Sequence, residues 1–322
     1  MPAELKFLFF WAIIILPFLC GAILNKRLLH PQKTAKRLIN INLFTLEPVI
    51  LLWTIWGLTL DRELIILPVA GLLTVLAGFL LGRLFVPFLK LDRISRVSYI
   101  ITSSLSNQGM TMGGLLCFMI AGERGLALAS IYIIYYLPFV FIVIFPYAKI
   151  SAIKNSDPDI KKSIFTIKQF RSFFLNFQNL PLAGIIIAVL LQYVGIRRPD
   201  VNFPLEILLA LAIAIYYLTL GINFKIGDLT SFIRELSTVS MAKFIFIPAM
   251  TYILLQFINF DKSIELVILL QSFAPAAIYS VISSILFELD SRMTSGIFVM
   301  NSLIFLFVLM PLLMVFSRAL VE

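Results

Sequence analysis

Two stretches of the chain decide its fold. Residues 103–146 read SSLSNQGMTMGGLLCFMIAGERGLALASIYIIYYLPFVFIVIFP, and residues 270–311 read LQSFAPAAIYSVISSILFELDSRMTSGIFVMNSLIFLFVLMP. Each begins with a polar, small-residue segment, passes an acidic turn at Glu123 or Asp290, and continues as an apolar run that ends in proline. Irregular backbone at membrane depth is tolerated only where it is buried in protein or lines a cavity. The two stretches therefore predict two broken membrane helices, each followed by a continuous one.

The composition of the 322 residues places the chain in a membrane. Hydrophobic residues make up 61% and charged residues 13%, with a mean hydropathy of +1.02. Soluble domains carry about a quarter of their residues charged, so this chain has too little polar surface for a water-soluble globule. The composition excludes an ordinary cytosolic enzyme, a disordered protein and a secreted disulfide scaffold.

Few residues of the chain are suited to catalysis or metal binding. Cys20 and Cys117 lie in apolar runs and His30 is the single histidine, so we expect no disulfide, metal site, cofactor or catalytic residue. HExxH, CxxC and GxxxxGK[ST] patterns are missing from the sequence, which argues against metal hydrolysis and ATP drive. The net charge of +9 lies in short loops rather than in one patch, so no nucleic-acid partner is expected.

Ten stretches are apolar enough to cross a bilayer core of about 30 Å, which takes about 20 residues per helix. They are 7–25, 38–58, 64–85, 97–121, 125–147, 178–196, 203–224, 238–258, 264–287 and 295–317. Two sets of five enter the membrane from opposite sides, which is the geometry of an inverted repeat. We predict an all-α integral membrane protein with one transporter domain over 1–322. It comprises repeat 1 at 1–150, a cytoplasmic linker at 151–177 and repeat 2 at 178–322, with broken, crossing fourth and ninth helices.

Loop charges predict the orientation of the chain. With the N-terminus outside, 19 of the 26 Lys and Arg residues fall on the cytoplasmic side, as the positive-inside rule requires. Both termini are then extracytoplasmic, in a multi-pass protein of the cell membrane. The first span is expected to be retained, because Lys26 and Arg27 follow its apolar run, whereas a signal peptide carries its positive charge before it.

The interruption of the fourth span is the first candidate binding site. Thirteen residues contain ten that are polar or glycine, among them Asn107, Gln108 and Gly109. A helix that restarts within the bilayer directs free N–H groups and a positive dipole end at the gap, which favours an anion such as a carboxylate. The alternative is close helix packing, since Gly109 and Gly113 form a GxxxG pattern.

The interruption of the ninth span is the symmetric candidate. Pro275 removes a backbone donor in mid-span and is followed by Ala276, with Tyr279 one turn further. By repeat symmetry the two interruptions are expected to cross near the bilayer centre. The alternative is a simple proline kink.

Glu47 is the one carboxylate near the middle of a predicted span. A charge there costs about 2.5–3.5 kcal/mol on insertion scales, so Glu47 is a candidate for proton coupling. The alternative is a protonated or hydrogen-bonded Glu that only ties two helices together. Glu206, Lys243 and Glu265 lie near predicted span ends, and we expect them to extend to the membrane interface.

The sequence resembles the auxin efflux carrier family of membrane permeases over nearly its whole length. The resembling segments are Asn107-Gln108-Gly109 with AGERGLALASIY, NLPLAGIIIAVLLQYVGI at 179–196, YYLTLGINF at 216–224, MAKFIFIPAMTYIL at 241–254 and SFAPAAIYSVISSILFELDSRMTSG at 272–296. The family shares its fold with bile-acid sodium symporters and moves organic anions such as auxin, malonate and other carboxylates. The resemblance implies a substrate site at the crossing of the fourth and ninth helices, carried by Asn107, Gly109 and Pro275.

Three positions depart from the pattern of that family. Met112 and Gly114 stand where the family usually has Gly and Pro, and Tyr279 stands where it often has Asn. The fold should tolerate these changes, whereas the substrate can differ.

These observations predict a secondary carrier of a small organic anion that works by alternating access. The anion, H⁺ or Na⁺ as coupling ion and the lipid bilayer are the expected partners, with a homodimer as one possible assembly. Two alternatives stay open: a sodium-coupled symporter of the bile-acid type, using oxygens around 102–111 and 271–284, and a membrane sensor that binds a ligand without moving it.

Overall fold

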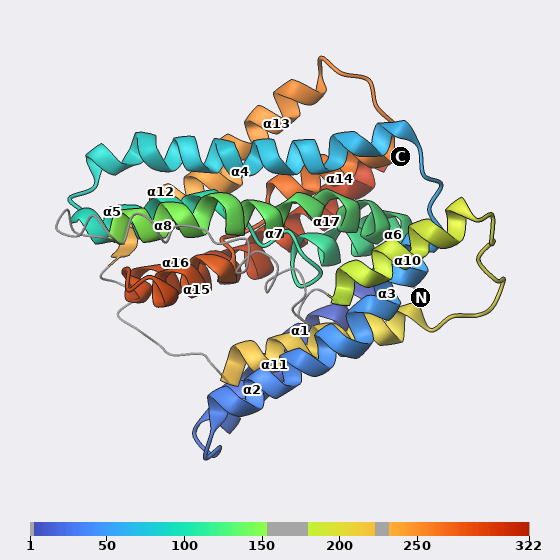
Figure 1. Cartoon of the computed structure of the whole chain (residues 1–322), viewed down its shortest axis with the longest axis horizontal. Coiled ribbons are helices and arrows are strands. Elements are labelled where there is room, and N and C mark those ends of the chain that lie inside the picture. The colour runs from blue at the N-terminus through green and yellow to red at the C-terminus, as the bar shows by residue number, and fades with distance from the viewer. Residues whose placement is uncertain (1–2, 153–179, 223–231, 322) are drawn as a thin grey trace. The chain divides into compact units, whose positions relative to one another are not determined.

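The computed structural model describes residues 3–152, 180–222 and 232–321, and every regular element among them is a helix (Figure 1). Beyond Ala152, the predicted linker lies outside the described residues. The elements are, in order, α1 (Ala3–Asn25), α2 (Pro31–Ile41), η1 (Asn42–Leu46), α3 (Glu47–Trp56), η2 (Arg62–Ile65), α4 (Ile66–Phe85), η3 (Val86–Phe88), α5 (Arg93–Ser104), α6 (Gly113–Tyr132), η4 (Ile133–Tyr135), α7 (Tyr136–Phe139), η5 (Val140–Ile144), α8 (Phe145–Ala152), α10 (Leu180–Tyr193), α11 (Leu205–Ile222), α12 (Ile233–Met241), η9 (Ala242–Phe246), α13 (Ile247–Leu255), α14 (Lys262–Ser272), α15 (Ile278–Leu286), α16 (Ser291–Ile304), η10 (Phe305–Leu309) and α17 (Met310–Val321).

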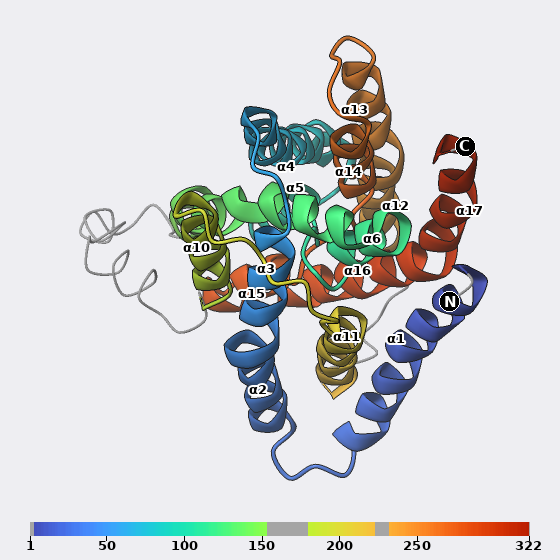
Figure 2. The ribbon, with the colours of Figure 1, turned by 90° about the vertical axis from the view of Figure 1, so that its right-hand side faces the viewer.

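The helices form two compact units, and each unit takes helices from both halves of the chain. The first unit contains α1, α2, η1, α3, α10 and α11, and the second contains the remaining helices. In the first unit α1 packs along α11 and α3 along α10 (Figures 1 and 2). The amide of Gln192 in α10 donates to the carbonyls of Ile55, Trp56 and Leu58, so it satisfies backbone groups left open where α3 ends.

Among the described residues, six helical stretches are long and apolar enough to cross a membrane. They are Lys33–Trp56, Arg62–Phe88, Gly113–Ser151, Leu205–Ile222, Ile233–Leu255 and Ser291–Phe316. Two shorter apolar helices, Ala12–Asn25 and Leu180–Tyr193, accompany them. An all-α membrane protein is thereby confirmed, whereas the count of ten spans stays a prediction. Part of the difference arises because the fourth and ninth predicted spans are each built from two short helices.

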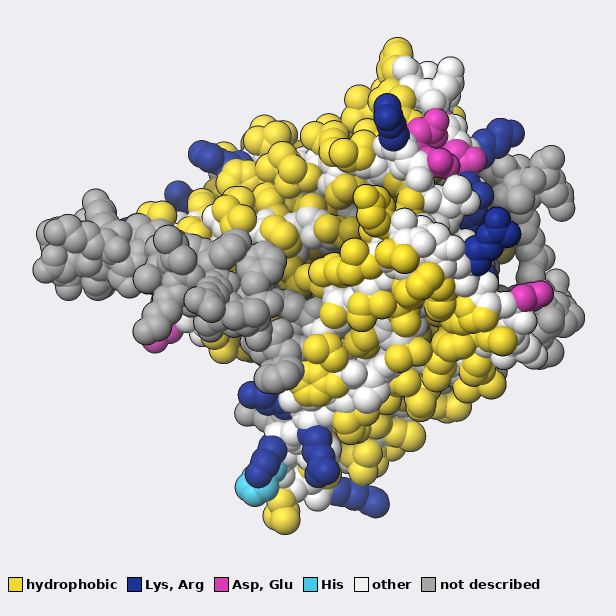
Figure 3. All heavy atoms as spheres, turned by 45° about the vertical axis from the view of Figure 1, so that its right-hand side comes forward, with side chains coloured by type: hydrophobic (Ala, Val, Ile, Leu, Met, Phe, Trp, Pro, Cys, Tyr) yellow, Lys and Arg dark blue, Asp and Glu magenta, His cyan; other side chains and the backbone are white. Residues whose placement is uncertain are grey.

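The surface has the character expected in lipid. Hydrophobic side chains cover much of the described surface seen in Figure 3, and most of the Lys, Arg, Asp and Glu side chains lie near its edges. Large apolar side chains on α4 such as Leu80 and Leu84 are 65% and 61% exposed. Such side chains would be unfavourable in water but fit a hydrocarbon environment.

Four π-helical segments interrupt long helices of the described chain, and each ends two residues before a proline. They are η1, η5, η9 and η10, followed by Pro48, Pro146, Pro248 and Pro311. Proline lacks an N–H and its ring clashes with the carbonyl four residues earlier. The wider i→i+5 turn moves that carbonyl away, so the helix continues past the proline without a sharp break.

The second unit begins both of its interrupted helices in the same way. Asp92 accepts a hydrogen bond from the Ser95 N–H at the start of α5, and Asp261 accepts one from the Ser263 N–H at the start of α14. The hydrogen bonds from Ser95 lower the pKa of Asp92. Partial desolvation alone would raise the pKa of Asp261, but the Ser263 hydrogen bonds and the charge of Arg124 outweigh it and lower that pKa.

Gly122 reverses the chain inside α6. Its φ of 62° and ψ of −149° lie outside the range that side-chain-bearing residues adopt, so α6 is two helices joined at this glycine. The predicted turn at Glu123 falls next to it. From here the chain returns through α7, η5 and α8.

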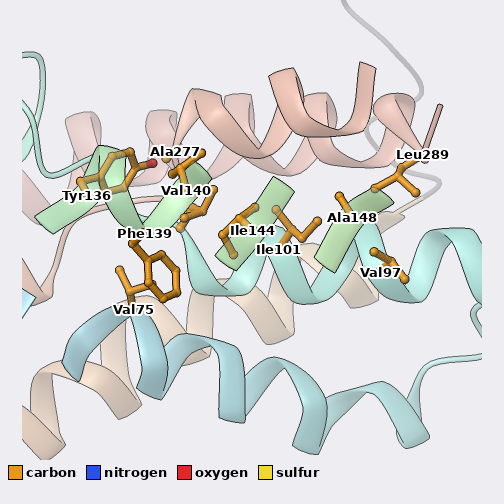
Figure 4. Close-up of a cluster of buried hydrophobic side chains, with 11 residues drawn as sticks. Val75, Val97, Ile101, Tyr136, Phe139, Val140, Ile144, Ala148, Ala277 and Leu289 are labelled. Atoms are coloured by element: carbon orange, nitrogen blue, oxygen red, sulfur yellow. The ribbon is translucent and has the colours of Figure 1, made fainter. Parts of the chain in front are cut away.

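The returning segment contributes to one of the hydrophobic clusters of the second unit. Its Phe139, Val140 and Ile144 pack against α4, α5 and the α15 region in a buried apolar cluster (Figure 4). Lipid tails are as apolar as these side chains, so close packing holds the cluster together rather than exclusion from water. The cluster includes Leu105 and Ala277, and it therefore supports both interrupted spans where they are not helical.

Candidate functional site

The two interrupted spans meet where their helices stop. Residues 105–112 separate α5 from α6, and residues 273–277 separate α14 from α15. The Asn107 N–H donates to the Pro275 carbonyl at 2.7 Å, and the Ala277 N–H donates to the Leu105 carbonyl at 3.1 Å. These bonds make an antiparallel bridge centred on Ser106 and Ala276, which we call the crossover. Backbone groups that would be costly to leave unpaired in a membrane thus satisfy one another.

A lysine lies against the crossover. The Lys243 side chain is fully buried, and its Nζ donates to the Ser103 carbonyl at 3.0 Å and to the Ser106 hydroxyl at 2.8 Å. The expectation that Lys243 extends to the interface is therefore wrong. Hydropathy set the start of this span at residue 238, but the helix begins at Ile233, so Lys243 lies about 15 Å along the axis from the first residue.

The same helix supports the other half of the crossover. Ser240, one turn before Lys243, accepts a hydrogen bond from the Asn301 amide at 2.9 Å, and Asn301 Oδ1 accepts the Ala276 N–H at 2.8 Å. Lys243 and Asn301 thus each satisfy one of the two bridge residues. The sequence reading overlooked Asn301, although a lone Asn in an apolar run was a usable sign.

Asn107 presents donors beside this bridge. Its backbone is fixed by the bond to Pro275, and its Oδ1 accepts from the Thr111 hydroxyl at 3.1 Å. The side chain is half-buried, and its Nδ2 has no hydrogen-bond partner among the described residues. Two amide hydrogens are therefore available to an acceptor such as a carboxylate oxygen.

Gln108 faces the interior instead of an open space. Its Nε2 donates to the Thr74 hydroxyl at 3.2 Å, and its Oε1 accepts from the Tyr135 hydroxyl at 2.6 Å. Its carbonyl accepts from Gln271 Nε2 at 3.1 Å, and the residue is 1% exposed. These contacts make Gln108 a residue that orients the segment between α5 and α6 and the Tyr135 side chain, so its predicted contact with substrate stays a prediction.

The two glycines of the GxxxG pattern differ in what surrounds them. A Cβ on Gly109 would meet only the end of Ile133 at 3.5 Å. A Cβ on Gly113 would collide with the Gln271 side chain and approach Gln108 Cα at 3.0 Å. The packing alternative therefore holds for Gly113, where α14 lies close to α6, and Gly109 is left for another role.

Tyrosines flank the ninth-span side of the crossover. Tyr279 is half-buried and its ring meets that of Tyr136 edge to face, with centroids 5.7 Å apart. The Tyr136 hydroxyl is buried without a hydrogen-bond partner among the described residues. An aromatic Tyr279 thus stands one turn from Pro275, close to an unused hydroxyl.

The ends of two helices contribute to the electrostatic potential at the crossover. α6 and α15 begin where the interruptions end, so their positive dipole ends face this region, and the first two N–H groups of α6 donate to the carbonyls of Asn107 and Gly109. Lys243 adds a buried basic side chain, and no carboxylate pairs with it among the described residues. The local arrangement of helix dipoles and the basic side chain therefore favours the binding of an anion.

Glu47 lies in the other unit and is described separately. It is half-buried and accepts a hydrogen bond from the Tyr216 hydroxyl of α11. Asn42, in the preceding η1, donates to the Ala212 carbonyl of α11 at 2.8 Å. Both contacts tie the two helices together, and a role in proton coupling stays a prediction.

A helical chain that crosses the membrane several times and holds a buried lysine against the crossover of two interrupted helices has the build of a membrane transporter. The model of the membrane transport protein family, which is the auxin efflux carrier family, matches residues 11–314. The chain belongs to this family, which is a family of transporters rather than of enzymes. A search of curated proteins found no significant match.

Proposed function

We propose that this protein is a secondary carrier of a small organic anion, of the carboxylate class, and that the anion binds at the crossover. The observation that carries the proposal is the buried Lys243 side chain, which contacts Ser106 and has no carboxylate partner among the described residues. An uncompensated charge in a membrane protein is costly unless something pairs with it. A carboxylate substrate supplies that opposite charge.

The binding arrangement follows from the donors around Lys243. Asn107 Nδ2, at the half-buried edge of the crossover, donates to one carboxylate oxygen, while the start of α6 supplies the positive end of a helix dipole. Lys243 acts at longer range, because its Nζ is held by Ser103 and Ser106. Tyr279 and Gly109 border the space that the rest of the substrate occupies.

The full proposal includes ten spans in two inverted repeats. It is supported by the matching Asp caps on α5 and α14, the interruption that follows each of these helices, and their antiparallel bridge. Alternating access then moves the two compact units against each other. Proton drive through Glu47 is part of this proposal.

A liposome assay tests the function. Purified protein is reconstituted with radiolabelled mono- or dicarboxylates outside and a pH gradient across the membrane, and accumulation is followed over time. We expect uptake by the wild type and by Lys262→Ala, an exposed-lysine control, and at least a tenfold loss in Lys243→Met. Binding without any uptake would identify a sensor instead of a carrier.

A labelling experiment tests the proposed orientation, with both termini outside and the central loop in the cytoplasm of a cell-membrane protein. In a Cys20→Ser background, which removes the exposed native cysteine, an impermeant thiol reagent should label Lys262→Cys in intact cells. It should leave Asn155→Cys unlabelled until the cells are opened. Labelling of Asn155→Cys in intact cells would reverse the orientation.

A further inference from the structure

The contacts of Lys243 have the chemistry of a monovalent cation site. Its ammonium is held by a backbone carbonyl, Ser103 O at 3.0 Å, and by a hydroxyl, Ser106 Oγ at 2.8 Å. Neutral oxygens of these two kinds are ligands that hard cations take. In transporters with interrupted helices, unwound carbonyls and the C-terminal ends of half-helices coordinate the coupling Na⁺.

The position of these oxygens fits a cation for a second reason. Ser103 lies in the last turn of α5, where carbonyls lack partners in the helix and the dipole is negative. Ser106 belongs to the interrupted segment itself and forms the bridge with Ala276. A cation at this place therefore joins the end of α5 to the centre of the crossover.

We propose that the Lys243 ammonium is the built-in cation of the crossover and fills the place of a dissolved Na⁺, so that the protein works without sodium. The transport half of this statement rests on the function proposed above, whereas the cation site does not. Because the amine is covalently tethered, its position is filled at any external ion concentration. The anion then meets a tethered cation instead of one whose occupancy depends on the sodium gradient.

Removing the amine should open the site to free cations. Lys243→Ala leaves the Ser103 carbonyl and the Ser106 hydroxyl without their donor in a buried space, which is unfavourable. A dissolved Na⁺ or methylammonium ion that enters will stabilise the folded protein by mass action. The wild type has no such vacancy.

Thermal unfolding of detergent-solubilised protein tests this inference. Midpoints are measured for the wild type, Lys243→Ala and Lys262→Ala in NaCl, methylammonium chloride and choline chloride at equal ionic strength. We expect equal midpoints in the three salts for the wild type and Lys262→Ala. Lys243→Ala should have a lower midpoint in choline, which rises with the concentration of Na⁺ or methylammonium.

Two outcomes would overturn the inference. One is a wild-type midpoint that is higher in NaCl than in choline chloride, because the protein would then hold a separate sodium site. If Lys243→Ala cannot be purified, this wild-type comparison alone tests the inference. The other is a Lys243→Ala midpoint that neither cation changes. Since the midpoints require no transport, cation stabilisation of Lys243→Ala together with a failure of every flux assay would remove the carrier function and leave the cation site in place.

Discussion

Lys243 Nζ lies 2.8 Å from the Ser106 hydroxyl oxygen, although 137 residues separate them in the chain. Through this contact α12 and η9 hold one half of the crossover, and through Ser240 and Asn301 they hold the other. A single helix thus contacts the fourth span directly and reaches the ninth span through Asn301 of α16. A shift of this helix will therefore displace the residues on both sides of the bridge together.

Replacing Asn301 by Leu should destabilise the second unit. The buried Ala276 N–H then loses its acceptor, which costs about 1–3 kcal/mol. Ser240→Ala is the milder control, because Asn301 can still accept from Ala276. Thermal midpoints in detergent should rank wild type first, Ser240→Ala second and Asn301→Leu last, and equal midpoints for the two variants would contradict the role of Asn301.

Replacing Asn107 by Ala should remove anion transport without unfolding the protein. The bond from its N–H to Pro275 persists, while the free Nδ2 donors are lost. A hydrogen bond to a charged group is worth about 1.5–3 kcal/mol, which corresponds to a loss of about 10- to 100-fold in binding. Carboxylate uptake in liposomes measures the effect, and full uptake with an unchanged midpoint would exclude Asn107 from the site.

The two glycines of the interrupted fourth span should respond differently to alanine. Gly113→Ala forces a methyl group against Gln271, an overpacking that costs about 1–3 kcal/mol. Gly109→Ala meets only Ile133 at 3.5 Å and should fold normally. If Gly109→Ala folds but transports poorly, substrate approaches this backbone. Equal stability of both variants would refute the packing role of Gly113.

Replacing Glu47 by Gln tests proton coupling. A fixed neutral side chain cannot release a proton, so substrate exchange should continue while uptake driven by a pH gradient is lost. Tyr216→Phe removes the hydrogen bond but keeps the acid, and it should retain coupled uptake. Unchanged pH-driven uptake in Glu47→Gln would show that Glu47 only ties α3 to α11.

The cap of α5 predicts a pH dependence of stability. Hydrogen bonds from Ser95 lower the pKa of Asp92 in the folded protein, so folding favours the charged form. Its contribution is therefore complete above the unfolded pKa of about 3.9, and it is lost as pH falls through the lower folded value. Asp92→Ala removes a cap worth about 0.5–2 kcal/mol near neutral pH. The midpoint difference from wild type should shrink in acid, and a difference that grows in acid would contradict this.

The interruptions of the two spans could be predicted from sequence because their causes are local. Polar and small residues around Asn107, and Pro275 in an apolar run, disrupt helices wherever they occur. The role of Lys243 could not be predicted in this way. Its burial depends on Ser103 and Ser106, which are distant in sequence, and hydropathy placed the start of its span five residues too late.

The hydrogen-bond partners of Asn301 and Gln108 could not be predicted from the sequence for the same reason. Each side chain is satisfied by groups that are distant in sequence, such as Ala276 or Thr74, and no local pattern encodes those pairs. The turn at Gly122, in contrast, lies next to the turn predicted at Glu123. This turn could be predicted because a glycine beside charged residues indicates a chain reversal without any distant contact.

The π-helical segments before the four prolines have a consequence for sequence comparison. An i→i+5 turn accommodates one residue more than an α-turn, and one residue rotates the helix by about 100°. Deleting a single residue from η9 should therefore restore a regular helix and swing Lys243 or the face after Pro248 away from its present neighbours. In alignments of related chains, we expect single-residue insertions or deletions at these segments. Each such gap will correspond to the presence or absence of a π-helical turn rather than to a change in loop length.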